Sequence, residues 1–546
     1  MSRRTELQRV ANDMFGWPEL RPAQLEAMEA VLAGRDVLAV MATGSGKSAI
    51  YQVPAVLIDG ATLVVSPLIA LQRDQISGLA STEAPEAVAI NSQLGSHDIA
   101  RNWQAVREHA AEYVFLAPEQ LTNDDVLTAL AQMDISLVVV DEAHCVSAWG
   151  HDFRPSYLRI ADSIERFGGP PIVALTATAS PVVRREIVEH LRLRDPLVIA
   201  SGFDRPNIAL EVSHYVADDD KRDAVLARML AVERPALLYT ATRKDTETYA
   251  AQLNSSGVTA RAYHAGLSRA QRDEVHQLFR ADNGVDVVVA TSAFGMGIDK
   301  ADVRTVVHAS IPDSMDTYYQ QIGRAGRDGK PATAALFYRP EDLGLARFFT
   351  TNRPDEELLA GVYADLDRRA PKRWSDLRTR LGVRGPRVTN ALNLLEEAEL
   401  VCSTRDGFTR NSSVGVEEAV HRAVEIVERN ERIDRTRVEM MRGYAETREC
   451  RRQFLLGYFG EPLPEPCGNC DNCASGVVDD EPPATDRWAV QTPVEHREWG
   501  SGVVMGAEDD RITVLFDEFG YRTLLLASIE HSGVLTRGDG RTVGGF

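Results

Sequence analysis

Residues 36–48 of this chain, DVLAVMATGSGKS, join an apolar strand pattern to a glycine-rich turn, and a helical pattern follows. A turn in this place lets backbone N–H groups face a phosphate at the positive end of a helix. Lys47 can reach the β- and γ-phosphates, and Ser48 can hold Mg²⁺. The pattern therefore predicts a nucleotide site that includes Thr43, Gly44, Ser45, Gly46, Lys47 and Ser48. Met41 replaces the usual first glycine, and an ordinary glycine turn before a helix is the alternative.

Outward from this loop, short β-branched runs alternate with longer helical patterns in two series. The first series is DVLAVMA, ATLVVS, YVFLA, ISLVVVDEA and PIVALTATA, and the second is PALLYTAT, TARAYHA, VDVVVATSA, RTVVHAS and TAALFY. Continuous apolar runs of this kind indicate parallel strands that are buried on both faces and joined by crossover helices. We expect an α/β fold with two parallel-sheet domains, over residues 1–205 and 206–350.

Two further motifs supply the groups that nucleotide hydrolysis needs. Asp141 and Glu142 end the strand LVVVDEAH, at the carboxyl edge where α/β sheets bind ligands. Asp141 would hold Mg²⁺, and Glu142 would orient and deprotonate water. In QQIGRAGRDG, residues 320–329, Arg324 and Arg327 would share one face of a helix, from which an arginine can reach the γ-phosphate. The alternatives are a helix N-cap for the acids and an ion-paired surface helix for the arginines.

After residue 350 the strand pattern stops and helical periodicity takes over. Three helical segments are followed by VCSTRDGFTR, in which the Asp406-Gly407 pair indicates a hairpin turn. The helical segments are 356–369, 375–381 and 387–400. These elements predict a winged-helix-like domain. The predicted order is a winged helix (354–412), a helical metal-binding module (413–476), an acidic linker (477–490) and a small β-barrel (491–546).

Charge is unevenly distributed along the chain. The formal net charge of −20 argues against a protein that coats nucleic acid non-specifically. Residues 368–395 nevertheless carry eight basic side chains and one acidic one, which favours DNA over protein as the partner of the winged helix. Its expected contacts are Arg384, Arg387, Asn390 and Asn393.

No apolar run is long enough to cross a bilayer, and MSRRTELQRV lacks the apolar centre of a signal peptide, so a membrane or secreted role is disfavoured.

Many motifs together resemble those of the RecQ family of superfamily 2 helicases. They are FGWPELRPAQ (15–24), SPLIALQRDQ (66–75), DEAH (141–144), ALTATA (174–179), FDRPN (203–207), YHAGL (263–267), ATSAFGMGIDK (290–300) and GRAGRDG (323–329). The resemblance covers about residues 10–345 and implies two RecA-like motor domains. It also implies ATP as the nucleotide, bound in addition by Arg21 and Gln24, of which Gln24 would read adenine.

The segment WGHDFRPSY, residues 149–157, resembles the aromatic-rich loop of this family. Trp149 and Phe153 offer stacking surfaces for unpaired bases, and Arg154 can contact a phosphate. The alternative is a loop whose aromatic side chains belong to the core. The resemblance further implies contacts with the DNA backbone from Ser66, Pro118, Glu119, Thr242, Arg243 and Thr291.

The resemblance resumes at residues 448–473, RECRRQFLLGYFGEPLPEPCGNCDNC. The thiolates of Cys450, Cys467, Cys470 and Cys473 suit a closed, structural Zn²⁺ site. Arg451 and Arg452 would either offset the negative charge of this site or reach a DNA phosphate. In the family pattern the winged helix follows the zinc module, whereas here it precedes it, so its hairpin is not assumed to split base pairs.

Residues 493–535 alternate apolar and polar side chains between glycines, as a small five-stranded barrel would. It resembles the Tudor-like C-terminal module of UvrD-type helicases. Residues 475–546 carry 13 acids and six bases, so the barrel should repel phosphate. We therefore expect a barrel that docks a protein partner, with a barrel packed against the motor as the alternative.

These motifs predict an ATP- and Mg²⁺-dependent DNA helicase that contains Zn²⁺ and moves 3′ to 5′ on single-stranded DNA, in repair or recombination. Its substrates would be single-stranded DNA and tailed or forked duplexes. We expect a monomeric bacterial protein of the cytoplasm, associated with the nucleoid. An RNA helicase is the alternative within the enzyme class, and an ATP-gated scaffold that binds DNA with little unwinding is the alternative outside it.

Overall fold

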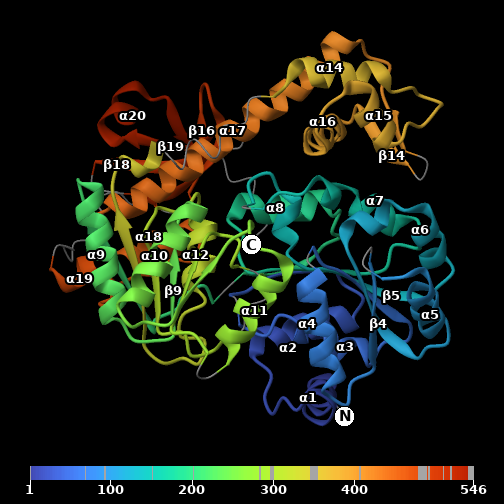
Figure 1. Cartoon of the computed structure of the whole chain (residues 1–546), viewed down its shortest axis with the longest axis horizontal. Helices are drawn as coiled ribbons and strands as arrows, with labels where there is room; N and C mark the ends of the chain where they lie inside the picture. The colour runs from blue at the N-terminus through green and yellow to red at the C-terminus, as the bar shows by residue number, and fades with distance from the viewer. Residues whose placement is uncertain are drawn as a thin grey trace.

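The structure is a computed structural model, and it describes most of the chain. The described residues are 2–42, 44–67, 69–91, 94–150, 152–200, 202–281, 284–295, 300–344, 354–404, 407–476, 488–489, 492–507, 510–516 and 519–538. Two α/β domains lie side by side, and the C-terminal part of the chain lies across one side of both (Figure 1). The predicted α/β class with two parallel sheets is confirmed.

The first domain is built on a seven-stranded parallel sheet in the order β3-β4-β2-β5-β6-β1-β7. Its strands are β1 (Val37–Val40), β2 (Ala61–Val65), β3 (Glu86–Ile90), β4 (Ala111–Leu116), β5 (Ile135–Val140), β6 (Ile172–Thr176) and β7 (Leu197–Ala200). The central strands β1, β2 and β6 are buried along their whole length, which explains their uninterrupted apolar sequences. The edge strands β3 and β7 are partly exposed, and for this reason their sequences did not stand out.

Helices and short 3₁₀ segments cover this sheet and connect its strands. They are α1 (Arg3–Phe15), α2 (Pro22–Leu32), α3 (Ala49–Ala55), α4 (Ile69–Ala80), α5 (Ser96–Arg107), η1 (Pro118–Thr122), α6 (Asp124–Ala131), η2 (Ala143–Val146), η3 (Pro155–Arg159), α7 (Ile160–Glu165) and α8 (Pro181–His190). Both the phosphate-loop strand β1 and the acid-bearing strand β5 are central, so their carboxyl ends lie at one edge of the sheet.

The second domain has a six-stranded parallel sheet in the order β10-β11-β9-β12-β13-β8. Its strands are β8 (Ile208–His214), β9 (Ala236–Tyr239), β10 (Ala260–Tyr263), β11 (Val287–Ala290), β12 (Thr305–His308) and β13 (Ala332–Tyr338), and its helices are α9 (Asp218–Ala231), α10 (Arg243–Ser255), α11 (Arg269–Arg280) and α12 (Met315–Ile322). The cysteine-rich segment covers the edge strand β8, because Leu210 N donates to Asn469 O at 3.3 Å. Val212 N donates to the Asp471 carboxylate at 3.1 Å.

Three short helices and a hairpin follow, as the sequence predicted for a winged helix. They are α14 (Glu356–Asp365), α15 (Trp374–Leu381), α16 (Gly385–Glu397), β14 (Val401–Thr404) and β15 (Gly407–Arg410). These elements have their own core, formed by side chains such as Val362, Leu377 and Leu392. Gly407 lies within the hairpin, whereas Asp406 lies outside the described residues.

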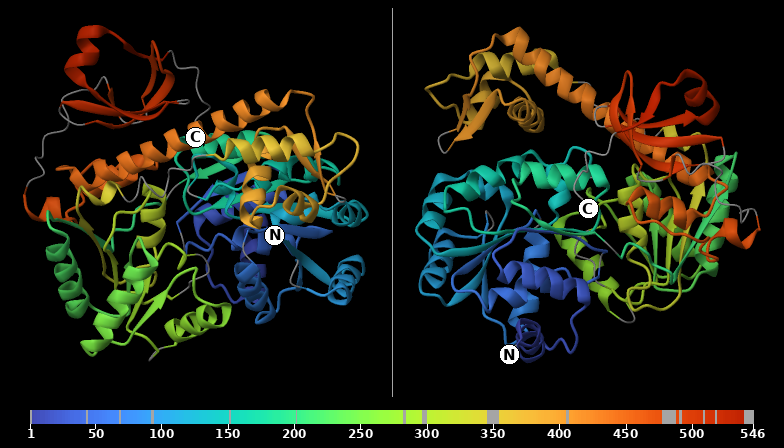
Figure 2. Two further views of the ribbon diagram at one scale, coloured as in Figure 1. Left: turned by 45° about the horizontal axis from the view of Figure 1, so that its top comes forward. Right: turned by 180° about the vertical axis from the view of Figure 1, so that it is seen from behind.

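The 31-residue helix α17 (Val416–Glu446) connects the winged helix to the rest of the C-terminal part. It begins beside α14 and α16 and ends over the second motor domain, where the barrel also lies against it (Figures 1 and 2). The helices α18 (Arg451–Tyr458) and α19 (Asp471–Ala474) follow it. The winged helix and the cysteine cluster therefore lie near opposite ends of α17.

The C-terminal strands form an antiparallel sheet in the order β19-β18-β17-β16-β20. Its elements are β16 (Pro493–His496), β17 (Gly500–Ala507), β18 (Arg511–Phe516), β19 (Gly520–Leu525), α20 (Leu526–Ser532) and β20 (Leu535–Arg537). The helix α20 was not predicted. Met505, Leu515 and Tyr521 belong to the large core that includes motor residues, so the barrel packs on the motor. The acidic stretch of the expected linker, residues 479–485, lies outside the described residues.

Candidate functional site

The glycine-rich loop leads from β1 to α3, where its sequence placed it. Gly44 and Gly46 have φ angles of +80° and +79°, in the left-handed region that glycine adopts without strain. Lys47 Nζ donates to Met41 O at 3.0 Å. Burial lowers the pKa of Lys47. Thr43 lies outside the described residues.

Gln24 supports this loop directly. Its Nε2 donates to Ser45 O at 3.1 Å and to Gly46 O at 2.9 Å, and its Oε1 accepts from Arg21 N at 2.8 Å. A Cβ on Gly46 would lie 2.7 Å from Gln24 Nε2, so the close approach requires glycine. The Gln24 amide thus holds the phosphate loop in this conformation, and its expected role in reading adenine stays a prediction.

Asp141 and Glu142 follow β5 and face the loop. Ser66 Oγ donates to Asp141 Oδ2 at 3.4 Å. Burial, and then the charge of Glu142, raise the pKa of Asp141 to about 6. Burial opposes ionisation of Glu142 as well, but its pKa is lowered by the hydrogen bond and charge of His144, whose Nδ1 lies 3.3 Å from Glu142 Oε2.

Glu142 also has an unusual backbone conformation, with φ of +50°. A non-glycine residue in this region is strained by about 1–3 kcal/mol, and such strain concentrates at functional sites. The surrounding fold therefore holds Glu142 in a backbone conformation that a non-glycine residue disfavours, and this fixes the direction of its carboxylate.

The second domain contributes Arg324 and Arg327 across the cleft. The helix predicted for these two residues is wrong: α12 ends at Ile322, and residues 323–329 form turns. The reason is glycine, because Gly326 has φ of +55° and Asn207 Nδ2 donates to its carbonyl at 2.8 Å.

Both arginines nevertheless reach the nucleotide loop and the acids. A Cβ on Gly44 would lie 3.6 Å from the Arg327 side chain, so Arg327 lies over the loop. The positive charge of Arg324 helps to lower the pKa of Glu142. Arg280 of α11 and Asp74 of α4 form an ion pair of 2.8 Å between the two domains at the edge of this cleft.

These residues line a cleft of about 630 Å³ between the two sheets. It is lined by Lys47 and Ser48 of the glycine-rich loop, by three carboxylates of the first domain (Asp74, Asp141 and Glu142) and by three arginines of the second (Arg280, Arg324 and Arg327). The donor set fits a nucleoside triphosphate with Mg²⁺, since cations meet the phosphates from both sides and carboxylate and hydroxyl oxygens are ligands that Mg²⁺ accepts.

The aromatic-rich loop lies directly behind the acids. Tyr157 OH donates to Asp141 O at 2.9 Å, which connects the loop to the carboxyl edge of the first sheet. Trp149 is only 6% exposed and packs edge-on against Tyr521 of the barrel, with ring centroids 6.4 Å apart. Arg154 forms an ion pair of 2.8 Å with Asp152 and donates to Pro67 O at 3.3 Å. In this conformation Trp149 presents no open surface to a strand, whereas Arg154 is partly exposed.

The other expected DNA-backbone contacts lie after strands of the two sheets. Ser66 follows β2 and Pro118 and Glu119 follow β4, while Thr242 and Arg243 follow β9 and Thr291 follows β11. Glu119 and Arg243 are exposed, whereas Ser66 and Pro118 are buried. Thr242 caps α10 by accepting from Asp245 N. Their role in DNA binding stays a prediction.

The third helix of the winged helix faces the motor. Arg387, Asn390 and Asn393 line a cavity of about 670 Å³ together with Phe153. Arg159 of η3 pairs with Glu396 of α16 at 2.6 Å, and Arg387 pairs with Asp355. The same cavity is lined by the carboxylates of Asp152, Asp313, Asp355, Glu397, Glu431 and Asp434. These carboxylates disfavour phosphate inside the cavity, whereas Arg387 and Asn390 are exposed at its edge.

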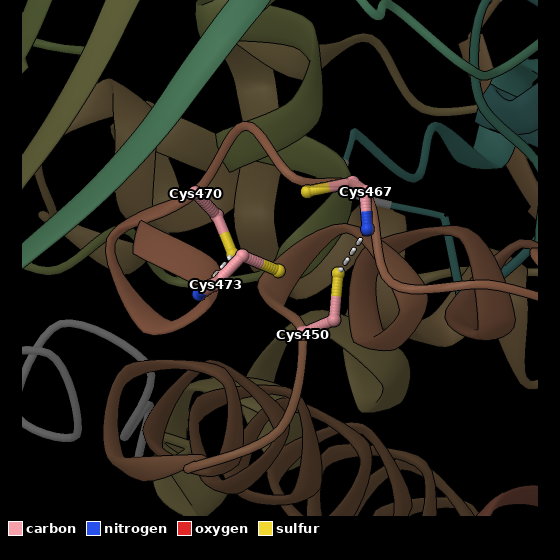
Figure 3. Close-up of side chains that lie close together, drawn as sticks. All are labelled: Cys450, Cys467, Cys470 and Cys473. Atoms are coloured by element: carbon pink, nitrogen blue, oxygen red, sulfur yellow. Dashed lines mark hydrogen bonds between the residues drawn. The ribbon is translucent and has the colours of Figure 1, made fainter. Parts of the chain in front are cut away.

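The four cysteines form a compact cluster, as Figure 3 shows. All four Sγ atoms lie within 4.8 Å of one another. Cys467 N donates to Cys450 Sγ at 3.2 Å, and Asn469 N donates to Cys467 Sγ at 3.3 Å. The donor set fits a structural zinc site.

The two arginines beside the cluster are internal. Arg451 forms an ion pair of 2.5 Å with Asp471 and donates to Tyr444 O at 2.8 Å. Arg452 donates to Ile208 O at 2.5 Å. Both are buried, so neither is free to meet DNA in solvent: Arg451 holds the cysteine-rich segment to the end of α17, and Arg452 joins it to the second domain.

Comparisons with known proteins agree with this architecture. The chain matches the family models described as DEAD/DEAH box helicase (residues 21–186), helicase conserved C-terminal domain (221–329) and RecQ zinc-binding (415–474). It is similar to the solved structure titled DUF1998 helicase MrfA bound to DNA and AMPPNP, with a TM-score of 0.53 and 17% identity over 76% of this chain and 63% of that one. This likeness concerns the fold alone.

In the described part of the chain, no helix has both the length and the apolar character to span a membrane.

Two bacterial relatives have clear sequence similarity. An "ATP-dependent DNA helicase RecQ" of Pasteurella multocida is 34% identical over 85% of this chain, which spans 61% of that protein. A "Probable ATP-dependent DNA helicase RecS" of Bacillus subtilis is 33% identical over 86% of this chain and 92% of the relative. With the order of the motor motifs and the four-cysteine cluster, these matches show that the chain belongs to the RecQ family of ATP-dependent DNA helicases.

Proposed function

We propose that this protein is an ATP- and Mg²⁺-dependent DNA helicase that moves 3′ to 5′ along single-stranded DNA and acts in repair or recombination. The observation that carries the proposal is the cleft between the two domains, which is lined by the glycine-rich loop and the two acids on one side and by Arg324 and Arg327 on the other. ATP in this cleft would be held by both domains, so hydrolysis would change how they sit together.

Each group in the cleft has a distinct role in the proposed reaction. Lys47 binds the β- and γ-phosphates, and Glu142 orients and deprotonates the attacking water. Arg324 and Arg327 approach the γ-phosphate from the other domain and stabilise the charge that develops there. Mg²⁺, held by Ser48 and Asp141, would neutralise charge on the phosphates. Arg21 and Gln24 flank the base of the nucleotide.

The proposed DNA path follows the carboxyl ends of the strands in both sheets. Ser66, Pro118 and Glu119 in the first domain and Thr242, Arg243 and Thr291 in the second would hold the backbone alternately as the cleft opens and closes. Trp149, Phe153 and Arg154 would sense the strand. The hydrogen bond from Tyr157 to Asp141 supports this assignment, because it places the sensing loop one contact from the Mg²⁺ ligand.

The remaining parts of the chain are assigned as follows. We propose motor domains at 1–205 and 206–350, a winged helix at 354–412 that contacts duplex DNA, a zinc module at 413–476 that stabilises the fold, a linker at 477–490 and a barrel at 491–546. A monomer in the bacterial cytoplasm, associated with the nucleoid, fits a DNA substrate and the bacterial relatives. A protein partner of the barrel would bind the surface that faces away from the motor.

A strand-displacement assay tests this function. Duplexes with a 3′ tail, a 5′ tail, a fork or blunt ends are incubated with and without ATP, and RNA duplexes with the same tails serve as the substrate control. We expect ATP-dependent unwinding of 3′-tailed and forked DNA. Unwinding only from the 5′ tail, or only of RNA, would contradict the proposal.

A second function is favoured by one observation, the acidic cavity under the winged helix. Because the carboxylates of this cavity lie beside Arg387 and Asn390, they would weaken phosphate binding at this helix face, and the protein would bind DNA weakly until the winged helix moves. An ATP-gated scaffold would show ATP-dependent DNA binding in the same assay without strand displacement.

A further inference from the structure

A buried arginine of α17 holds the backbone of the aromatic-rich loop. Arg437 Nη2 donates to Ala148 O at 2.9 Å and also to Gly150 O, 289 and 287 positions earlier in the chain. Its Nη1 donates to Asp434 at 2.8 Å on the same helix. The residue is 9% exposed. The guanidinium is therefore fixed by its own helix and joined to the loop through two carbonyls.

The carbonyls that Arg437 binds lie close to the hydrolytic acids. Gly150 packs on the backbone of His144, since a Cβ at this position would lie 2.2 Å from His144 O. His144 Nδ1 lies 3.3 Å from Glu142 Oε2. The loop backbone at Gly150 is therefore packed directly against the segment that carries Glu142.

The helix that carries Arg437 contacts each of the other C-terminal parts and the second motor domain. Asn430 Nδ2 donates to Glu397 of the winged helix at 3.2 Å. Thr436 lies against Gly520 of the barrel, and Tyr444 OH lies 3.0 Å from Tyr318 OH of α12. Figure 2 shows this helix running between the winged helix and the barrel. A helix moves as a rigid body, so a displacement at either end reaches Arg437.

We propose that Arg437 is a positioning residue that sets the aromatic-rich loop and thereby couples movement of the C-terminal part to DNA-stimulated ATP hydrolysis. This inference rests on the proposed helicase function. Arg437 acts through the loop backbone, because its guanidinium hydrogen-bonds Asp434, Ala148 and Gly150. A planar guanidinium satisfies two carbonyls and one carboxylate at the same time, which a lysine ammonium on a flexible stem does less well.

The experiment measures ATP hydrolysis by the full-length protein with and without saturating single-stranded oligothymidylate. The variants are Arg437→Gln, which removes the charged fork, and Arg437→Lys, which retains the charge. Arg442→Gln is the matched control, because Arg442 is on the same helix, is half exposed and pairs only with Glu439 and Glu446 in the contacts of the described residues. Asp434→Asn loosens the guanidinium while Arg437 stays in place, and it decides the question if Arg437→Gln does not fold.

We expect Arg437→Gln to lower the DNA-stimulated kcat by about tenfold while its DNA-free rate and its KM for ATP stay within about twofold of the wild type. Arg437→Lys should recover part of the stimulation, Asp434→Asn should lose part of it, and Arg442→Gln should match the wild type. Stimulation of Arg437→Gln equal to that of the wild type overturns the inference. A parallel loss of DNA-free rate and melting temperature also overturns it, because the arginine would then act on stability alone. If DNA does not stimulate the wild type, the proposed function itself fails.

Discussion

Gly520 tests whether the barrel restrains the aromatic-rich loop. It begins β19 with φ of +74°, and a Cβ there would lie 2.8 Å from the Thr436 side chain and 3.1 Å from the Trp149 ring. Gly520→Ala would therefore both strain the backbone and force the barrel away from α17. Gly533 is the matched control: it lies in the same barrel with φ of +59°, and a Cβ there would meet nothing within 4 Å.

The expected magnitude follows from these two contributions. An alanine in the left-handed region costs about 1 kcal/mol, and both variants incur this cost within the barrel. Overpacking a closed contact costs about 1–3 kcal/mol more, and only Gly520→Ala incurs it. The docked arrangement should thus become less favourable by about 1–3 kcal/mol relative to Gly533→Ala, a factor of roughly 5 to 150 in the equilibrium.

Hydrogen exchange followed by mass spectrometry measures this effect directly. The amides to follow are those of Gly150 and Arg154, which donate to Ser147 O and Cys145 O inside the loop, and those of α17 around Thr436. Exchange of these amides should be faster in Gly520→Ala than in Gly533→Ala, by a factor of up to roughly 5 to 150. Equal exchange in the two variants would refute the reasoning, because the contact at Trp149 would then contribute nothing to docking.

Three further predictions concern the nucleotide and metal sites. Lys47→Ala should lower ATP hydrolysis by at least about 10²-fold, and Glu142→Gln should lower it by about 10²- to 10⁴-fold while retaining ATP binding. A radiometric turnover assay measures the loss of hydrolysis, and a nucleotide-binding assay shows whether each variant still binds ATP. Near-wild-type turnover in Glu142→Gln would contradict the role of Glu142 in activating water. The Mg²⁺ concentration needed for half-maximal ATPase should increase as the pH falls through about 6. Burial and the charge of Glu142 raise the pKa of Asp141 to about 6, so a proton then competes with the metal. A Mg²⁺ requirement that is constant between pH 5 and pH 8, roughly the range that brackets this pKa, would exclude Asp141 as a ligand. Metal analysis should find about one Zn²⁺ per chain, and Cys470→Ser should lower the zinc content and the melting temperature together; an iron–sulfur chromophore would contradict the assignment.

The sequence predicted the elements whose signal is local. The strand that leads into Gly44 and Lys47, the acids after β5 and the spacing of the four cysteines each depend on a few neighbouring residues and on the periodicity of buried strands. The winged-helix elements were predicted for the same reason. One local prediction was wrong: Arg324 and Arg327 lie in turns, because Gly326 and Gly329 have the positive φ that interrupts a helix.

Tertiary structure decided how the separately folded parts meet. No periodicity in the chain indicates that Trp149 packs against Tyr521, that α16 faces an acidic cavity, or that Arg437 binds the carbonyls of Ala148 and Gly150. Contacts of this kind join residues up to several hundred positions apart, and they depend on the shape and polarity of two finished surfaces. The sequence by itself therefore determined which residues line the cleft and which form the cysteine cluster, whereas only packing determined that the barrel and α17 contact the loop beside Asp141 and Glu142.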